Sequence, residues 1–421
     1  MGKWKNQQIG DSVRLHSFTD SRYKTMRVSV NMRVPLARES AAAYGILPAL
    51  VSRATERYPD YTALSARLAE LYGASLSSTV SKMGEYQILS LTAGGISSRY
   101  AFGGEDMGAQ LTDLLLDVFF SPVKDGEGLF PLDGFLQEKR QLLEMKDAEF
   151  NDKITYAHQR CEELLFEGQP GGMDRYGSRK EVEELDRKQV TDAWETLLSS
   201  AKFDIFVLGD CTPDLDRLQT KFGHLGSPQG SGMLAFEKPR EVRHVEEVQP
   251  LSQSKLSMAY RIDCTPEDAM LFRLMAAVLG GVPSSKLFQN VREKMSLCYH
   301  CSAGLSLNSR TLFVESGVET ENLEKAEREI GKQLEALQNG DLTEEELLSA
   351  KLALRNSLHA VEDSLPSLEG WCMGRTFRRE DLSIQAAEEQ LLSYTAQQVA
   401  QAAQKVYPAV VYCLKGSGSA K

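Results

Sequence analysis

The feature that most constrains the fold of this chain of 421 residues is an internal repeat. Strict alternation of apolar and polar residues predicts strands, and apolar residues spaced by three or four positions predict helices. Both halves give the same order: a strand, two helices, two strands, a helix, a long helical segment, a helix and a closing strand. In the first half these segments are 25–35, 41–58, 62–74, 75–83, 86–95, 111–122, 135–166, 188–198 and 203–210. In the second half they are 256–263, 268–281, 284–294, 296–307, 311–319, 323–340, 343–364, 395–407 and 409–416.

A repeat of this length predicts a duplicated domain. Consecutive strands joined by short turns, with the helices in blocks, indicate an α+β fold rather than a doubly wound one. We therefore expect two homologous domains, each a mostly antiparallel sheet packed with helices. Gly, Pro and Ser followed by charged residues at 226–250 are typical of a linker, and a helix-breaking segment is expected at 365–370. The predicted organisation is an N-terminal domain at 1–225, a linker at 226–245 and a C-terminal domain at 246–421.

Composition excludes several classes of protein. A net charge of −11 without clustered Lys and Arg argues against a nucleic-acid binder. The chain has no apolar run long enough to span a membrane, and residues 1–16 lack the apolar stretch of a signal peptide. Seven scattered cysteines, an odd number, favour reduced thiols and a cytoplasmic location. No glycine-rich nucleotide-binding motif occurs.

Two side chains in the stretch 280–301 are candidate site residues. Arg292 lies near the end of a basic helical turn, and Tyr299 lies near the start of the following strand. A tight turn between a helix end and a strand start can aim both groups into one space. There the guanidinium group can bind a carbonyl or carboxylate, and the phenol can donate to a developing oxyanion. The spacing alone is common, so a solvated arginine and a half-buried strand tyrosine remain the other interpretation.

Cys298 and Cys301 in the same stretch match the C-x-x-C form. Residues three apart on an alternating strand point to opposite faces. The pattern therefore favours two unrelated strand cysteines over a redox pair.

The order of elements, the duplication and the segment SSKLFQNVREKMSLCYHCSAG (284–304) resemble the pitrilysin/insulinase-type (M16-like) zinc peptidases. The nearer resemblance is to the branch of short, two-domain subunits that includes the mitochondrial processing peptidase. That family carries a motif similar to S-x-L-F-x-x-[IV]-R-E-x-x-G-L-x-Y in its second domain. The residues that fit it are Ser285, Leu287, Phe288, Val291, Arg292, Glu293, Leu297 and Tyr299. Ser296 stands where the family has glycine.

The resemblance fails at the metal site. The family binds zinc in its first domain through an H-x-x-E-H helix, whose glutamate activates the bound water. The matching positions here are Pro48, Val51 and Ser52, none of which binds zinc or acts as a base. Glu144 lies roughly where the family has its third ligand, but one carboxylate does not hold zinc. All histidines are isolated from one another: His16, His158, His224, His244, His300 and His359. We therefore expect no metal or other cofactor in this chain and no peptidase activity of the chain alone.

The resemblance implies a role beside a partner. In some bacterial pairs of this branch, a zinc-lacking subunit supplies the arginine and tyrosine to a homologous subunit that bears H-x-x-E-H and the zinc. By this resemblance the chain is the second subunit of a heterodimeric peptidase that processes peptides. Arg292 orients the substrate carbonyl and Tyr299 stabilises the oxyanion. Two alternatives stay open, a non-catalytic scaffold or assembly subunit and a stand-alone peptide-binding protein.

Overall fold

The computed structural model describes residues 3–228, 230, 232–381 and 383–417. The chain forms two compact units. The first consists of Met1–Asp147 and Met173–Gly230, and the second of Ala148–Gly172 and Ser231–Lys421. Within the described residues, no helix combines the length and the apolar character needed to cross a membrane.

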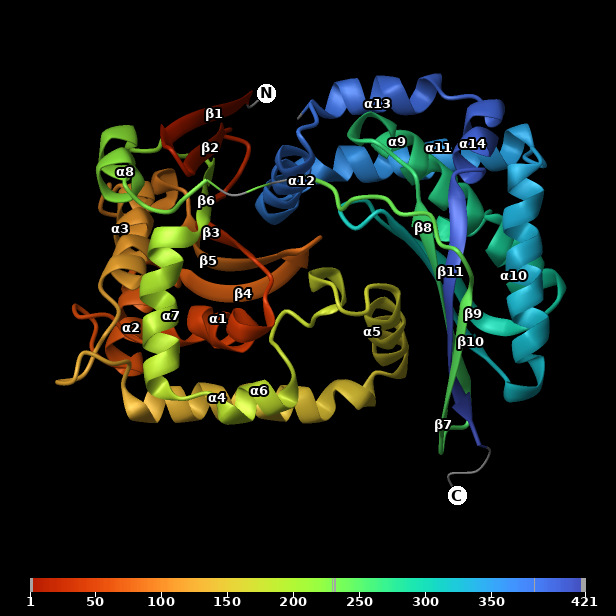
Figure 1. Ribbon diagram of the computed structural model, residues 1–421. Coiled ribbons are helices and arrows are strands. Elements are labelled where there is room, and N and C mark those ends of the chain that lie inside the picture. Colours follow the sequence, from red (N-terminus) through yellow and green to blue (C-terminus); the bar gives the residue numbers. More distant parts are fainter. Residues whose placement is uncertain (1–2, 229, 231, 382, 418–421) are drawn as a thin grey trace. The chain divides into compact units, whose positions relative to one another are not determined.

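The first unit holds a six-stranded sheet in the order β1-β2-β6-β3-β5-β4, in which only the β2–β6 pair is parallel among the described strands. Its strands are β1 (Lys3–Gly10), β2 (Val13–Thr19), β3 (Thr25–Pro35), β4 (Ser75–Met83), β5 (Tyr86–Ile96) and β6 (Lys202–Gly209). Its helices are α1 (Arg38–Val51), α2 (Tyr61–Glu70), α3 (Met107–Phe120), α4 (Leu132–Ala148), α6 (Arg179–Glu184), α7 (Arg187–Ser200) and α8 (Leu215–Phe222). Helices α1, α3 and α7 contact this sheet (Figure 1).

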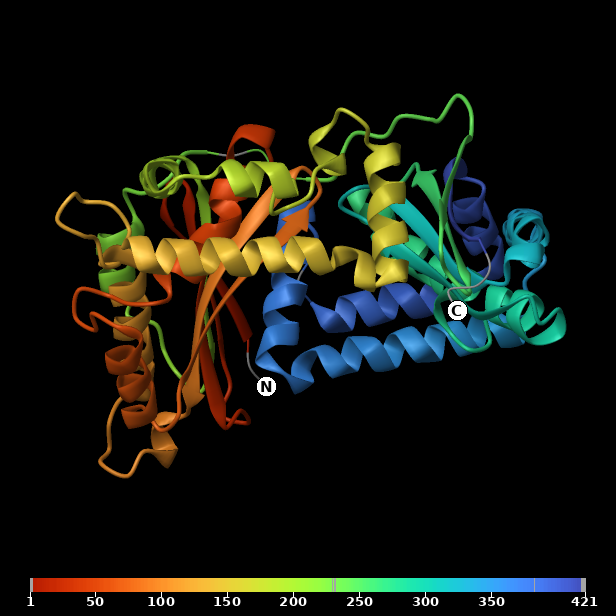
Figure 2. The same ribbon diagram turned by 90° about the horizontal axis from the view of Figure 1, so that it is seen from below.

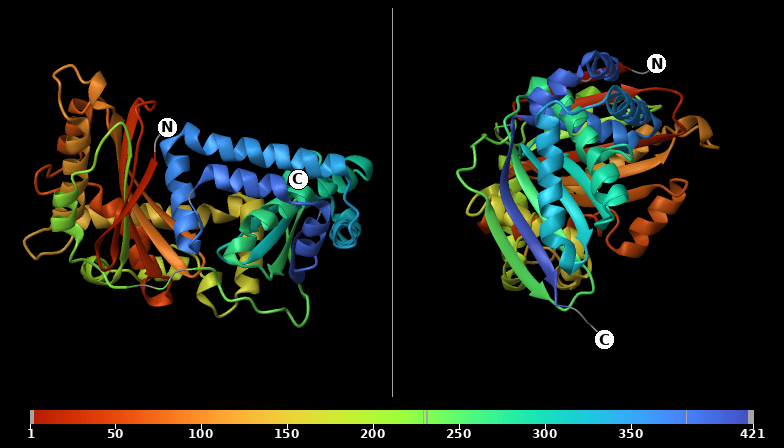
Figure 3. Two further views of the ribbon diagram at one scale, coloured as in Figure 1. Left: turned by 90° about the horizontal axis from the view of Figure 1, so that it is seen from above. Right: turned by 90° about the vertical axis from the view of Figure 1, so that its right-hand side faces the viewer.

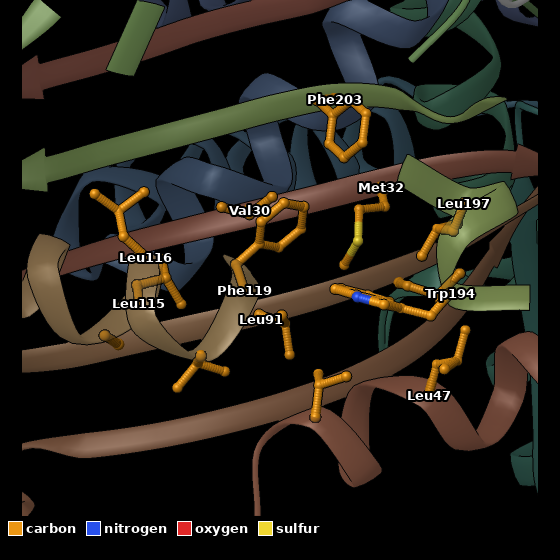
Figure 4. Packing of buried hydrophobic residues seen from close by; sticks show 14 of the residues in the cluster. Val30, Met32, Leu47, Leu91, Leu115, Leu116, Phe119, Trp194, Leu197 and Phe203 are labelled. Atoms are coloured by element: carbon orange, nitrogen blue, oxygen red, sulfur yellow. The ribbon is translucent and has the colours of Figure 1, made fainter. Parts of the chain in front are cut away.

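The core of the first unit forms because alternate residues of each strand point to the helices. Val30 and Met32 of β3 and Phe203 of β6 face Phe119 of α3 and Trp194 of α7 (Figure 4). The rings of Phe119 and Trp194 meet edge to face, with their centroids 5.3 Å apart.

The second unit holds a five-stranded sheet in the order β7-β11-β8-β10-β9, in which β7 pairs parallel with β11 and the other pairs are antiparallel. Its strands are β7 (Arg243–Gln249), β8 (Ser254–Ile262), β9 (Cys298–Ser306), β10 (Thr311–Val318) and β11 (Val406–Gly416). Its helices are α5 (Lys153–Leu165), α9 (Ala269–Ala276), α10 (Leu323–Gln338), α11 (Glu344–Ala360), α12 (Leu365–Arg378), α13 (Ile384–Ser393) and α14 (Ala396–Ala403). Two π-helical segments, η5 (Ala277–Gly281) and η6 (Leu287–Lys294), follow α9.

Helices pack on both faces of the second sheet. Leu256, Met258 and Tyr260 of β8 join the large core formed with α9, α10 and α14, whereas Ala259 faces α5 on the other side. Helix α10 lies over this sheet (Figure 3), and α11 and α13 run side by side (Figure 2). The two units thus confirm the predicted α+β fold, with mostly antiparallel sheets packed by helices.

The predicted helical segment 135–166 is wrong in one respect, because it is two helices that belong to different units. Helix α4 ends at Ala148, and after one short turn the carboxylate of Asp152 accepts hydrogen bonds from the backbone N–H groups of Ile154 and Thr155 and caps α5. Helix α5 then packs on β8, β10 and β11. His158 Nδ1 lies 2.9 Å from Glu315 Oε1 of β10, which also accepts a hydrogen bond from Ser257. Residues 148–172, placed in the N-terminal domain from the sequence, therefore pack with the second unit.

Regular structure reaches into both breaks that were expected from the sequence. Strand β7 begins inside the predicted linker 226–245, because residues 243–249 find a parallel partner in β11. Positions 229 and 231 of that linker lie outside the described residues. The expected break at 365–370 is the start of α12, where Ser364 caps the first turn and Pro366 occupies a position that needs no N–H donor.

Gly280 permits the close approach of η5 to β9. A Cβ atom at Gly280 would lie 2.6 Å from the Ala303 nitrogen and 2.8 Å from the Leu287 side chain. We expect Gly280→Ala to lower the free energy of unfolding by about 1–3 kcal/mol, because the strand must move away. Gly281→Ala is the matched control, since its nearest contact would be an ordinary 3.5 Å. Urea denaturation of both variants checks this, and equal midpoints would contradict it.

Candidate functional site

Arg292 projects from a π-helical segment rather than the α-helix expected from the sequence. In η6, Leu287 and Val291 are buried in the core of the second unit and fix the segment against it. Arg292 follows on the outer side, with its side chain 40% exposed. Its guanidinium carbon lies 4.3 Å from the centre of the Phe288 ring, a cation–π contact that restricts the side chain. π-Helical turns are frequent at functional sites.

The turn from η6 to β9 carries backbone strain. Ser296 has a φ of +48°, in the left-handed region that disfavours residues with a Cβ atom by about 1–2 kcal/mol. The Leu297 N–H donates to the Val291 carbonyl at 3.1 Å, so the chain folds back directly onto the end of η6. The position that is glycine in the family motif keeps a glycine-like backbone here although it is serine.

Tyr299 is the extra residue of a β-bulge. On β10, Gly317 pairs with His300 and Val318 pairs with Cys298, so Tyr299 has no partner of its own in this register. Bulges re-aim side chains, and the Tyr299 side chain is 79% exposed. The prediction of a strand start is confirmed, but the half-buried alternative for this tyrosine is wrong.

The bulge also overturns the expectation for Cys298 and Cys301. They stand opposite Val318 and Ser316, two positions apart on β10, and so point to the same face of the sheet. Both are buried in the core of the second unit. The hydrogen bond from Cys301 lowers the pKa of the Cys298 thiol despite burial, and the nearby charge of Arg292 lowers it further. The same hydrogen bond and burial raise the pKa of Cys301.

The structure thus places Arg292, Cys298 and Tyr299 around one short connection. Arg292 acts on Cys298 through its charge. Among the described residues, no hydrogen bond or ring contact joins Arg292 to Tyr299 directly. The arginine and the phenol are thus both solvent-accessible and lie before and after one turn of the chain.

The helix that matches the family's zinc helix offers no metal ligands. Pro48 and Val51 are buried in α1, and the Ser52 hydroxyl donates to the Pro48 carbonyl at 2.7 Å. The Glu144 side chain on α4 is 69% exposed and lies near Arg140. Over the described part of the chain, no group of three or more His, Cys, Asp or Glu residues is arranged to hold a metal ion. These residues do not fit the zinc that the family binds.

An ion pair joins α4 to the segment that follows α1. The Arg53 guanidinium donates to Glu138 at 2.5 Å and to Gln137 at 3.0 Å. Gly134 gives it room, because a Cβ atom there would lie 3.2 Å from Arg53 Nε. This contact holds α4 against the end of α1, the helix that matches the family's zinc helix.

Known proteins match this chain in sequence and in fold. Residues 184–354 match the family described as the peptidase M16 inactive domain. The chain is 26% identical over 413 residues to the probable inactive metalloprotease YmfF of Bacillus subtilis (strain 168), with 96% of each chain covered. The crystal structure of a conserved protein from Enterococcus faecalis V583 has a TM-score of 0.89 at 25% identity, covering 99% of this chain and 100% of that one.

A second structure agrees in fold alone. The peptidase M16 inactive domain from Pseudomonas fluorescens has a TM-score of 0.79 at 18% identity, with both chains fully covered at 100%. The family resemblance predicted from the segment 284–304 is thereby confirmed. Residues 184–354 thus match the peptidase M16 inactive domain, and the chain as a whole is similar to an M16-like inactive metalloprotease.

Proposed function

We propose that this chain is the zinc-lacking subunit of a heterodimeric peptidase. In this proposal a homologous subunit bearing H-x-x-E-H holds the zinc, which activates the attacking water there. This chain contributes Arg292 and Tyr299 to the substrate bound at that subunit. The observation that carries the proposal is the exposed Tyr299 on its bulge, one turn after Arg292 on a π-helical segment.

Exposure and restraint together favour a role in trans. A residue that serves another chain must be exposed before assembly, and an oxyanion donor must already be oriented when charge develops. The bulge meets both conditions for Tyr299, because the ladder to β10 holds the backbone on each side of it. Arg292 is restrained by stacking on Phe288 and by an ion pair between its Nε and Glu293 Oε1 at 3.5 Å, and its side chain stays 40% exposed. Arg292 would then hold a peptide carbonyl, and Tyr299 would donate to the oxyanion.

The sheet topology supports an extended peptide as substrate. Strand β9, which carries Tyr299, is at the edge of its sheet. Edge strands present unpaired N–H and C=O groups, and an extended peptide can add to them as a further strand. Residue-specific recognition would then come from side chains along that edge.

A reconstitution assay tests the proposal. A quenched peptide library is incubated with this chain, with an H-x-x-E-H subunit from the same genome, and with both together, each with and without a chelator. The proposal predicts cleavage only in the mixture and its loss with chelator. A partner that is fully active alone, or a complex that forms but stays inert, would favour a scaffold. Peptide capture by this chain alone, with no complex, would favour a binding protein.

A further inference from the structure

Cys298 and Cys301 form a dithiol that the proposed peptidase role does not use. The bulge at Tyr299 places them on the same buried face, at ladder positions equivalent to neighbours on one side of a regular strand. Such positions are separated by about 7 Å between Cα atoms. Disulfides span Cα separations of about 4.4–6.8 Å. Oxidation therefore needs only a small shortening of the strand, at the bulge that carries Tyr299.

The surroundings make the two thiols chemically unequal. The hydrogen bond from Cys301 favours the thiolate of Cys298, and the Arg292 charge adds to this. The hydrogen bond to the Cys298 sulfur and burial raise the pKa of the Cys301 thiol. A pair of one nucleophilic and one resolving thiol suits stepwise oxidation.

We propose that Cys298 and Cys301 form a reversible disulfide that tightens the bulge at Tyr299, with hydrogen peroxide as the oxidant. The Cys298 thiolate attacks one peroxide oxygen, the O–O bond breaks, and hydroxide leaves a sulfenic acid on Cys298. The Cys301 sulfur then attacks the Cys298 sulfur, the S–O bond breaks, and the Cys301 proton leaves with the oxygen. Two thiols lose two hydrogens, and one peroxide becomes two waters.

The bond is expected to be labile. Closing the strand from a separation at or beyond the usual limit stores strain, and strained disulfides are more easily reduced. A thiol reductant therefore restores the dithiol. Shortening the chain between Cys298 and Cys301 changes the direction in which the bulged Tyr299 projects.

Peptide mapping of the intact native chain tests the disulfide without any partner. After brief peroxide treatment and alkylation, trypsin releases residues 295–310, which hold Cys298 and Cys301 and no other cysteine. We expect this peptide to lose two hydrogens and to regain them with dithiothreitol. Cys211 is the internal control, because it is less buried while burial raises its pKa to about 12. Its oxidation ahead of the pair would overturn the proposal.

Two variants separate the roles of the thiols. Cys301→Ser should trap a sulfenic acid on Cys298 that reacts with dimedone. In Cys298→Ser, the remaining thiol of Cys301 should be oxidised at least about tenfold more slowly than the thiol of Cys298 is in the wild type. Equal rates in the two variants, or overoxidation of wild-type Cys298 without a disulfide, would overturn the proposal. Circular dichroism of the unoxidised variants shows that both are folded.

A consequence for turnover rests on the proposed function. In the reconstituted peptidase, peroxide should change the turnover of the wild type and leave that of Cys301→Ser unchanged while dithiothreitol reverses the wild-type effect. The peptide map is read without the partner. A disulfide that forms in an inert mixture therefore counts against the peptidase role alone, and an active peptidase without the disulfide counts against this inference alone.

Discussion

Tyr299→Phe is expected to lower turnover of the reconstituted peptidase by about 10²–10³-fold while leaving assembly intact. Removal of one oxyanion donor costs a rate factor of this order. The change deletes a single oxygen from a side chain that is 79% exposed, so folding and core packing are unaffected. The measurement is kcat on the best peptide of the library, with the amount of complex followed by size-exclusion chromatography.

Tyr61→Phe is the matched control for that variant. Tyr61 is 72% exposed and lies at the start of α2 in the first unit, so the same atom is removed from an equally exposed tyrosine. Its turnover should equal that of the wild type. If Tyr299→Phe assembles and turns over within about twofold of the wild type, the phenol is not an oxyanion donor. Arg292 and Tyr299 would then be remnants in a scaffold.

Much of the fold could be predicted from the sequence, because burial of one face of a strand or helix gives its apolar residues a regular spacing along the chain. Strand β3 has the predicted bounds 25–35, since it is central in its sheet and its apolar residues alternate. The hairpin of β1 and β2 was missed because β1, KWKNQQIG, is an edge strand made mostly of polar residues. Helix α12 was missed because Pro366 was interpreted as a breaker, although proline is favoured in a first turn.

The long-range arrangement was not predictable in the same way. The residue pattern of 135–166 is helical throughout, although α4 ends at Ala148, and only the Asp152 cap marks the start of α5. That α5 packs on the second sheet depends on a complementary surface formed by β8, β10 and β11, far along the chain.

The candidate site was predicted in part. The helix-to-strand motif placed Arg292 on a helical segment and Tyr299 in the following strand, as the structure has them, and their role in a site stays a prediction. The alternation of a regular strand gave the wrong relative orientation for Cys298 and Cys301, because a bulge depends on how two strands pair and not on the sequence of one strand. Only the register with β10 shows that Tyr299 is the extra residue. The one local sign was Ser296 at the glycine position of the motif, which marks an unusual turn but not the bulge after it.

Asp204→Ala is expected to lower the free energy of unfolding by about 3–5 kcal/mol, the largest stability effect we expect at a single residue. Asp204 of β6 is buried, and its Oδ1 lies 3.0 Å from His16 Nε2 of β2, which is also fully buried. Burial raises the pKa of Asp204, but the His16 hydrogen bond and the charges of His16 and Arg33 outweigh burial and hold that pKa below its usual range. Alanine would leave His16 and the buried Arg33 without this carboxylate.

The pH dependence distinguishes this mechanism from a simple loss of packing. A carboxyl group whose pKa is lower in the folded state stabilises the protein fully above its unfolded pKa of about 4. That stabilisation is lost as the pH falls through the lower, folded pKa. The urea midpoints of wild type and Asp204→Ala should therefore differ most near neutral pH and converge in acid. A difference that stays constant down to about pH 3 would instead assign the effect to the cavity. Asp192→Ala, which removes a carboxylate from the exposed ion pair with Lys188, should leave the midpoint unchanged.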